Sequence, residues 1–203
     1  MDELLERWLA ELVATPGLTA VTGLAEARRL HVDDALAALP LLREDPVVDV
    51  GSGGGSPGIP LARARPELAF VLLEASRRKC EFLERWADEL PNVSVVCARA
   101  EEHGRFEGRD AYGTALARAL APPPVALEWS LPLLRPGGRV VLYAGEIDAA
   151  PAAAAAERLA ARVAGLLPAV GSERRSLLVV EKLGPTPDGF PRRPGVARKR
   201  PLA

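Results

Sequence analysis

The sequence is poor in aromatic residues and cysteine, and it has no long apolar run. Aromatic side chains make up only 4% of its 203 residues while hydrophobic residues reach 48%, so we expect a core built mainly of Ala, Leu and Val. No stretch approaches the roughly 18 uncharged residues that a membrane span needs. The acidic start Met1-Asp2-Glu3 differs from the basic start of a signal peptide. We therefore expect a cytoplasmic protein with no membrane partner.

Only two cysteines are present, Cys80 and Cys97. Two cysteines are too few for a disulfide framework, and these two lie too far apart in the sequence to form a metal-ligand pair. We predict that both are plain thiols and that the chain binds no metal ion.

The net charge of −1 conceals an asymmetry between the two ends of the chain. Residues 1–46 carry nine acidic and four basic side chains, whereas residues 182–203 carry one acidic and six basic side chains. A basic end is a hint of a phosphate-bearing partner, although a solvated terminus produces the same count.

From Pro46 onward, short β-branched or apolar runs alternate with helical patterns. The expected strands are residues 47–50, 69–73, 93–97, 111–116, 139–143 and 176–183, and the expected helices are residues 2–14, 25–39, 59–65, 76–90, 126–134 and 152–167. This alternation predicts an α/β fold with a doubly wound, mostly parallel sheet. We divide the chain into a helical N-terminal extension (1–45), a cofactor-binding domain (46–183) and a basic, proline-rich tail packed on or near that domain (184–203).

A glycine-rich loop follows the first expected strand. Gly51, Gly53 and Gly55 stand at alternate positions, which lets the backbone turn tightly and approach a nucleotide-like cofactor at the start of the next helix. Ser56 occupies the position where a dinucleotide fingerprint needs its third glycine, so a nicotinamide-dependent dehydrogenase is disfavoured. Asp49 followed by these glycines resembles the first motif of class I methyltransferases, which are Rossmann-like proteins with a seven-stranded sheet that bind S-adenosylmethionine.

Four further residues are candidates for cofactor contacts. Glu74 ends the second expected strand, 23 residues after Gly51, where a carboxylate can accept hydrogen bonds from both ribose hydroxyls. A carboxylate favoured by the dipole at the start of the next helix is the alternative, and it is compatible with the ribose contact. Ala100 and Glu101 follow the third strand and are expected to flank the adenine, with a simple surface charge as the alternative for Glu101. Arg118 is expected either to orient the cofactor carboxylate or to cover the edge of the sheet.

Longer segments resemble one bacterial family, the small-subunit rRNA methyltransferases RsmG (GidB). The similar segments are Asp49-Val-Gly-Ser-Gly-Gly-Gly-Ser-Pro-Gly-Ile-Pro-Leu-Ala62, Leu30-His-Val-Asp-Asp-Ala-Leu36, Ala98-Arg-Ala-Glu-Glu102, Ala117-Arg-Ala119 and Phe190-Pro-Arg-Arg-Pro-Gly-Val-Ala-Arg-Lys-Arg-Pro-Leu202. The resemblance spans roughly residues 18–202. It implies transfer of a methyl group from S-adenosylmethionine to N7 of a guanosine in a decoding-region loop of 16S rRNA, with the cofactor contacted by Gly51, Ser56, Ala100, Glu101 and Arg118.

The sequence departs from this family at two positions. Many relatives have a Lys-Gly pair where this chain has Tyr143-Ala144-Gly145, and a serine often stands where this chain has Ala117. Any role of that lysine is absent here or is served by another residue.

Guanine N7 carries a lone pair and no proton, so methylation there requires no general base. We therefore assign no catalytic residue and expect catalysis by positioning. His31 and His103, the only histidines, are expected to be structural or surface residues.

The partner implied by the resemblance is 16S rRNA or the small ribosomal subunit, bound by a monomer of this chain. The tail would supply the phosphate contacts. These basic residues are Arg192, Arg193, Arg198, Lys199 and Arg200. The alternatives are a small-molecule methyltransferase of the same fold and an RNA-binding relative that has lost catalysis.

Overall fold

In a computed structural model that describes residues 2–43, 45–168 and 175–203, seven strands form one sheet in the order β3-β2-β1-β4-β5-β7-β6. The strands are β1 (Val47–Val50), β2 (Phe70–Glu74), β3 (Val93–Cys97), β4 (Tyr112–Arg118), β5 (Leu134–Ala144), β6 (Ala161–Pro168) and β7 (Ser176–Lys182). Strands β1 to β5 pair in parallel, and β7 runs antiparallel to both β5 and β6. The expected α/β fold with a mostly parallel seven-stranded sheet is confirmed.

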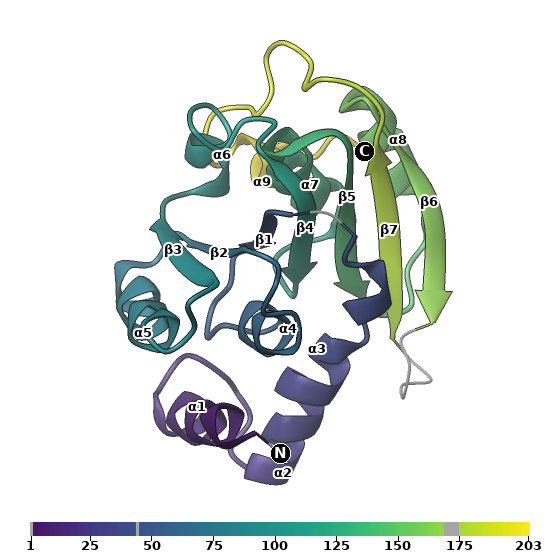
Figure 1. Cartoon of the computed structure of the whole chain (residues 1–203). Coiled ribbons are helices and arrows are strands. Elements are labelled where there is room, and N and C mark those ends of the chain that lie inside the picture. The colour runs from purple at the N-terminus through teal and green to yellow at the C-terminus, as the bar shows by residue number, and fades with distance from the viewer. Residues whose placement is uncertain (1, 44, 169–174) are drawn as a thin grey trace.

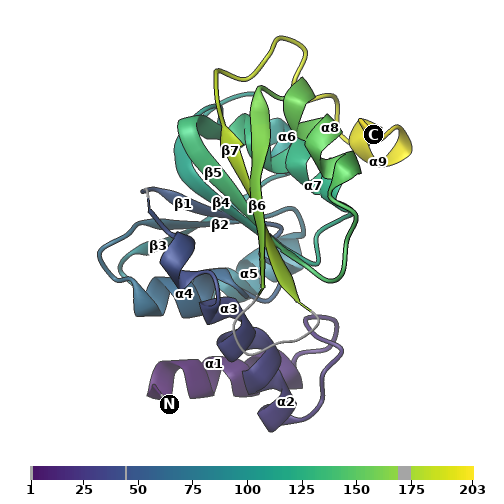
Figure 2. The same ribbon diagram turned by 90° about the vertical axis from the view of Figure 1, so that its right-hand side faces the viewer.

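Helices cover both faces of this sheet (Figures 1 and 2). The α-helices are α1 (Glu3–Ala14), α2 (Leu24–Arg28), α3 (Asp34–Leu36), α4 (Gly58–Ala64), α5 (Arg77–Ala87), α6 (Ala100–His103), α7 (Pro123–Ser130), α8 (Ala150–Arg158) and α9 (Val196–Lys199). Helices α4 and α5 pack on one face, while α7 and α8 pack on the other. Within the described ranges, no helix is long and apolar enough to cross a membrane.

Helix α1 packs against α4 and α5 through one apolar face. Leu5, Trp8, Leu9 and Leu12 are buried, as their helical spacing predicts, and they join the core formed by α4, α5 and β2. The indole Nε1 of Trp8 also donates a hydrogen bond to the Gly54 carbonyl oxygen at 2.9 Å. The N-terminal extension therefore supports the glycine-rich loop directly.

Strand β6, which was not among the six expected strands, comes from a segment that we expected to be helical. The alanine-rich pattern predicted a helix over residues 152–167, but α8 ends at Arg158 and β6 begins at Ala161 after a turn in which Ala160 has φ = +54°. Alanine favours a helix locally, yet residues 161–168 pair with β7 in an antiparallel ladder that is interrupted by one register shift between Val163 and Gly165. Tertiary pairing overrides local propensity in this segment.

The helix expected over residues 25–39 is interrupted. Helix α2 passes into a π-helical turn, Arg29–Asp33, and then into the short α3, and a 3-10 turn, Leu39–Leu41, follows. The π-helical turn holds His31, whose side chain takes part in the site described below. Such widened turns are frequent where a helix presents a functional side chain.

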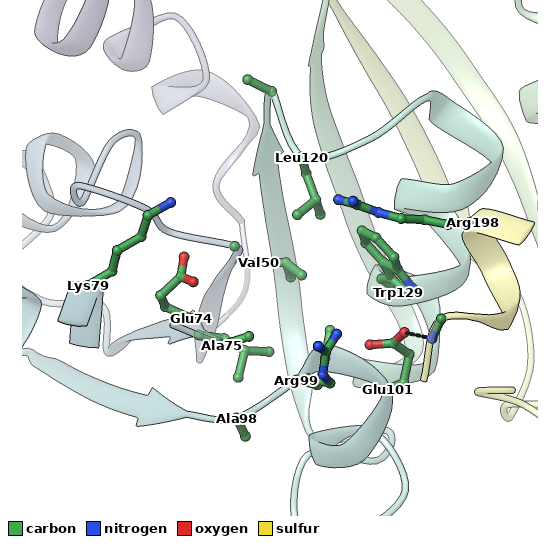
Figure 3. A pocket seen from close by; sticks show the side chains of 15 residues that line it. Val50, Glu74, Ala75, Lys79, Ala98, Arg99, Glu101, Leu120, Trp129 and Arg198 are labelled. Atoms are coloured by element: carbon green, nitrogen blue, oxygen red, sulfur yellow. Dashed lines mark hydrogen bonds between the residues drawn. The ribbon is translucent and has the colours of Figure 1, made fainter. Parts of the chain in front are cut away.

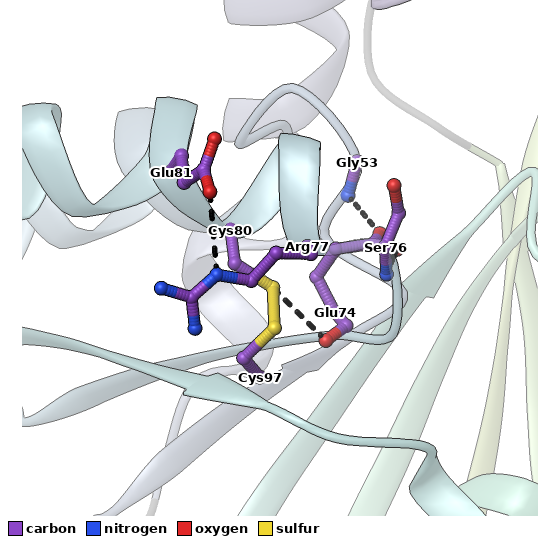
Figure 4. The surroundings of a disulfide bond; sticks show 7 residues. All are labelled: Gly53, Glu74, Ser76, Arg77, Cys80, Glu81 and Cys97. Carbon is purple, nitrogen blue, oxygen red and sulfur yellow. Dashed lines mark hydrogen bonds and ion pairs between the residues drawn. A yellow bond between two sulfur atoms is a disulfide. The ribbon is translucent and has the colours of Figure 1, made fainter.

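The prediction that both cysteines are plain thiols is wrong. Cys80, in the first turn of α5, and Cys97, at the end of β3, form a disulfide with a Cα–Cα distance of 5.8 Å (Figure 4). Parallel pairing places Cys97 beside Glu74 of β2, and the Cys80 sulfur lies 3.3 Å from the Glu74 carbonyl oxygen. A count of cysteines argues against a disulfide framework, but only the packing of α5 on β3 shows that these two can meet.

The C-terminal tail is fastened across the end of the sheet and α7. Arg109 donates hydrogen bonds to the carbonyl oxygens of Phe190 at 2.6 Å and Thr186 at 2.9 Å, and Arg105 donates to Pro191 at 3.1 Å. Helix α9 packs against α7, with Ala197 buried in the core. The tail is therefore an ordered part of the fold despite its lack of periodic pattern.

Candidate functional site

The sheet order reverses between β1 and β4, and the candidate site lies at the carboxyl ends of these strands. Such a switch point is where ligands bind in open α/β sheets. A cavity of about 410 Å³, here called the main cavity, opens there (Figure 3). A second cavity of about 230 Å³, here called the loop cavity, lies on the other side of the glycine-rich loop and shares Gly51, Lys79 and Ala119 with the first.

The glycine-rich loop adopts a backbone that L-amino acids disfavour. Gly51, Gly53 and Gly55 have φ values of +70°, +59° and +98°. A Cβ atom on Gly51 would collide with the side chain of Leu120, and one on Gly55 would collide with Ile59. Glycine is therefore required both for the turn and for the close packing of the loop.

Asp49 lies beneath this loop and is fully buried. One carboxylate oxygen accepts a hydrogen bond from the Gly58 N–H at 3.0 Å, and the other has no partner among the described residues. Burial raises the pKa of Asp49 to about 7. Neither Asp49 nor Gly55 lines the main or the loop cavity, so the structure places both where they shape the loop.

Glu74 presents a fixed carboxylate to the main cavity. It accepts hydrogen bonds from the Gly53 N–H at 2.9 Å and from the Ser76 N–H at 2.8 Å, one on each oxygen. An ionised carboxylate has about four lone-pair positions, so one acceptor position per oxygen is left for a ligand. Two such positions side by side suit the adjacent hydroxyls of a ribose.

Arg118 and His31 form a hydrogen-bonded group in the wall of the loop cavity. The guanidinium donates to the Leu30 carbonyl oxygen at 2.6 Å and lies 2.8 Å from His31 Nδ1, while His31 Nε2 lies 2.9 Å from Thr19 Oγ1. Because a guanidinium can only donate, Nδ1 must be the acceptor and Nε2 must carry the proton. Burial, with Arg118 and Arg175 nearby, lowers the pKa of His31 to about 4. His31 is therefore neutral near pH 7.

The tail forms one wall of the main cavity. The Gly195 N–H donates to Glu101 Oε1 at 3.1 Å, and the Arg198 guanidinium lies 5.1 Å from the centre of the Trp129 ring (Figure 3). Glu101 is thus a cavity-lining residue that also holds the tail in place. The segment expected to meet a phosphate-bearing partner borders the cofactor candidate site.

Arg192 is placed differently from the other basic residues of the tail. It forms a two-pronged ion pair with Glu128, with Nε donating to Oε1 at 2.6 Å, and the Glu128 side chain is only 1% exposed. Arg193, Lys199 and Arg200 are exposed. The prediction that Arg192 contacts RNA stays a prediction, but its guanidinium already has a buried partner.

Seven of the nine candidate cofactor residues line a cavity. The main cavity is lined by Gly51, Glu74, Ala100 and Glu101, and the loop cavity is lined by Gly51, Gly53, Ser56 and Arg118. Their roles in binding stay predictions.

Lys79, Leu120 and Trp129 also line the main cavity, and sequence reasoning missed them. For Lys79 a signal exists in the sequence. The first turn of α5 contains Arg77, Arg78 and Lys79 and no acidic residue, which opposes the helix dipole and indicates an anionic partner. Nothing in the sequence marks Trp129 as part of a site, because its apolar surroundings are those of any core residue.

The combined cavities suit a nucleoside that carries an amino acid. Val50, Leu73 and Trp129 offer apolar surface for a base, and Glu74 offers acceptors for a ribose. Lys79 and Arg118 offer positive charge to a carboxylate at the loop cavity. S-adenosylmethionine has these three parts, so the residues present fit this cofactor.

Comparison with known proteins identifies a family. The profile "GidB: rRNA small subunit methyltransferase G" matches residues 3–177. A protein of Rubrobacter xylanophilus called ribosomal RNA small subunit methyltransferase G is 45% identical over 188 residues, covering 85% of this chain and 72% of its own. A protein of the same name from Carboxydothermus hydrogenoformans is 39% identical and covers 98% of this chain and 91% of its own.

The solved structures add agreement on the fold. The S-adenosylmethionine-dependent methyltransferase SibL in its apo form is similar with a TM-score of 0.60 and 18% identity, covering 86% of this chain and 62% of its own. At that identity the similarity concerns the fold alone.

Proposed function

This chain belongs to the rRNA small subunit methyltransferase G family and is a methyltransferase that uses S-adenosylmethionine, and on that premise we propose that its acceptor is N7 of a guanosine in a decoding-region loop of 16S rRNA. The observation that carries the proposal is the cavity at the β1/β4 switch point. One side of that cavity has the glycine-rich loop and Glu74, and the other side has the basic tail.

The residues of this chain divide the work of holding the cofactor. Glu74 binds the ribose hydroxyls, because its carboxylate is fixed by two backbone N–H groups and keeps free acceptor positions. Arg118 and Lys79 attract the carboxylate of the amino acid part, and His31 holds the Arg118 guanidinium in place. Trp129 and Val50 give the base an apolar surface.

The bound cofactor supplies a methyl group attached to a positively charged sulfur. When bound, it would supply this methyl group to the lone pair of guanine N7, with the C–S electron pair left on sulfur and no proton to remove. The protein therefore has to align three atoms and exclude water, and alignment alone is worth several kcal/mol. No residue of the chain has to act as a general base.

The exposed part of the tail is proposed to bind RNA phosphates. Arg193, Lys199 and Arg200 are exposed, and Arg198 lies at the edge of the main cavity. Phosphate contacts of this kind set affinity and salt dependence rather than sequence choice. The paired Arg192 is left out of this set because it neutralises Glu128.

The function is tested by methyl transfer from labelled S-adenosylmethionine to rRNA. Purified wild-type protein is incubated with naked 16S rRNA and with small subunits lacking the modification, and N7-methylguanosine is located by chemical cleavage at the modified base. One methylated guanosine in a decoding-region loop is the expected result. Methylation at another atom, or of small molecules only, would refute the proposal.

The phosphate contacts are tested by the salt dependence of RNA binding. Replacing Arg193 and Lys199 together by Ala should flatten the slope of log K against log salt by about 1.4 to 1.8, since each lost phosphate contact contributes about 0.7 to 0.9. The matched control replaces Arg7 and Arg162, which are exposed on α1 and β6. Equal slopes for the two variants would contradict the assignment.

A further inference from the structure

A third cavity, of about 200 Å³ and here called the apolar cavity, lies beside the main cavity. It is bounded by the carboxyl ends of β4 and β5 and by the start of α7. Ala119 and Leu120 belong to the walls of both cavities. A ligand in the apolar cavity is therefore next to anything bound in the main cavity.

The walls of this cavity are apolar. Ala117, Pro123, Ala126 and Leu142 contribute side chains without polar atoms. Such walls suit the two faces of a flat ring system, which gains free energy from leaving water.

The edge of the cavity, in contrast, offers unused backbone hydrogen-bonding groups. Ala119 has φ = +52°, a left-handed conformation that is rare for a residue other than glycine. Among the described residues, the N–H and C=O groups of Ala119, Leu120 and Ala121 have no hydrogen-bond partner. A backbone outlier held next to a cofactor cavity is typical of a segment arranged for a ligand.

The described residues that line the apolar cavity include no carboxylate, imidazole or amine. Tyr143 is the one titratable side chain among them, and its hydroxyl is turned away to donate a hydrogen bond to the Ala35 carbonyl oxygen at 2.5 Å. An acceptor that must lose a proton, such as a hydroxyl or an amino group, finds no base here. An acceptor with a free lone pair needs none.

We propose that the apolar cavity receives the target guanine, flipped out of the RNA, and that the backbone of residues 119–121 binds a polar edge of the base. The proposal rests on the proposed function and adds the place where the acceptor binds. Enzymes that modify a nucleobase take it out of the stack into a fitted pocket. Because the apolar cavity offers no proton-accepting side chain, it selects a ring nitrogen that carries no proton.

Filling the cavity tests this inference. Ala121 and Ala144 line only the apolar cavity and are partly exposed, so Ala121→Leu and Ala144→Leu add bulk there from two different elements. Each variant should slow methyl transfer to the small-subunit rRNA by about 10²-fold, as misplacement of the reacting atom by an ångström does. The dissociation constant of S-adenosylmethionine, measured by calorimetry, should change by less than about twofold.

The matched control is Ala164→Leu on the exposed face of β6, which lines none of these cavities and should transfer methyl groups at the wild-type rate. Wild-type rates in both Ala121→Leu and Ala144→Leu would overturn the inference. A loss of cofactor affinity equal to the loss of rate would also overturn it, because the cavity would then belong to the cofactor. If the wild-type protein itself forms no N7-methylguanosine in this assay, the proposed function fails instead.

Discussion

Replacing Arg192 by Ala should destabilise the fold rather than simply weaken RNA binding. The change removes both hydrogen bonds to Glu128 and leaves the Glu128 carboxylate, whose side chain is only 1% exposed, with no counter-charge. Breaking a buried ion pair by removing one partner costs about 3–5 kcal/mol. Because 24% of the Arg192 side chain is exposed and water can enter, we expect the low end, about 3 kcal/mol.

Urea unfolding followed by circular dichroism measures this loss, and a thermal melt should show the midpoint lowered by about 6–12 °C for a chain of this size. Arg193→Ala removes the same charge from an exposed neighbour and should change the free energy of unfolding by less than about 0.5 kcal/mol. Adding Glu128→Gln to Arg192→Ala should recover part of the loss, since the amide needs no counter-charge. Equal stability of the Arg192→Ala and Arg193→Ala variants would refute the reasoning.

Three further outcomes are expected. Glu74→Gln should weaken S-adenosylmethionine binding about 10- to 100-fold in calorimetry, because hydrogen bonds to a charged acceptor are lost. The control Glu84→Gln, at an exposed position of α5, should leave the affinity unchanged. Equal affinities of the two variants would contradict the ribose contact. The pKa of His31 is lowered to about 4, so the unfolded chain binds this proton more readily and the free energy of unfolding falls as the pH drops from about 6.5 towards 4. In urea unfolding, His31→Asn should remove about 2–3 kcal/mol of the loss between pH 7 and pH 4.5. An unchanged pH profile would argue against a buried neutral imidazole. Dithiothreitol should lower the free energy of unfolding of the wild-type protein by about 3 kcal/mol, because it opens the loop closed by Cys80 and Cys97. It should have no effect on a variant with both cysteines replaced by Ser. An equal effect on the wild type and on this variant would argue against the disulfide.

The fold and the position of the site follow largely from local patterns. The β-branched run before Gly51, the alternating glycines and the acidic residue at the end of the next strand are short-range signals, and the structure has β1, the glycine-rich loop and β2 ending at Glu74 at those positions. These signals are readable because each depends on the conformation of a few consecutive residues.

Two of the errors, the helix expected over residues 152–167 and the two free thiols, share one physical cause. Residues 161–168 look helical in isolation and become a strand because β7 offers hydrogen-bonding partners, and Cys80 meets Cys97 because α5 packs on β3. In both cases the stabilising contact comes from a segment that local sequence does not reveal. Tertiary contacts decide such segments.

By itself the sequence determined the class of the protein: an α/β chain with a glycine-rich cofactor loop and a basic tail. Only the tertiary structure decided which basic residues of the tail are available to contact RNA phosphates, since Arg192 neutralises the buried Glu128 while Arg193 stays exposed. It also brought Ala119 to the walls of the main, loop and apolar cavities, with Leu120 packed against Gly51. Local patterns specify backbone conformation, whereas charge pairing and cavities arise only where distant segments meet.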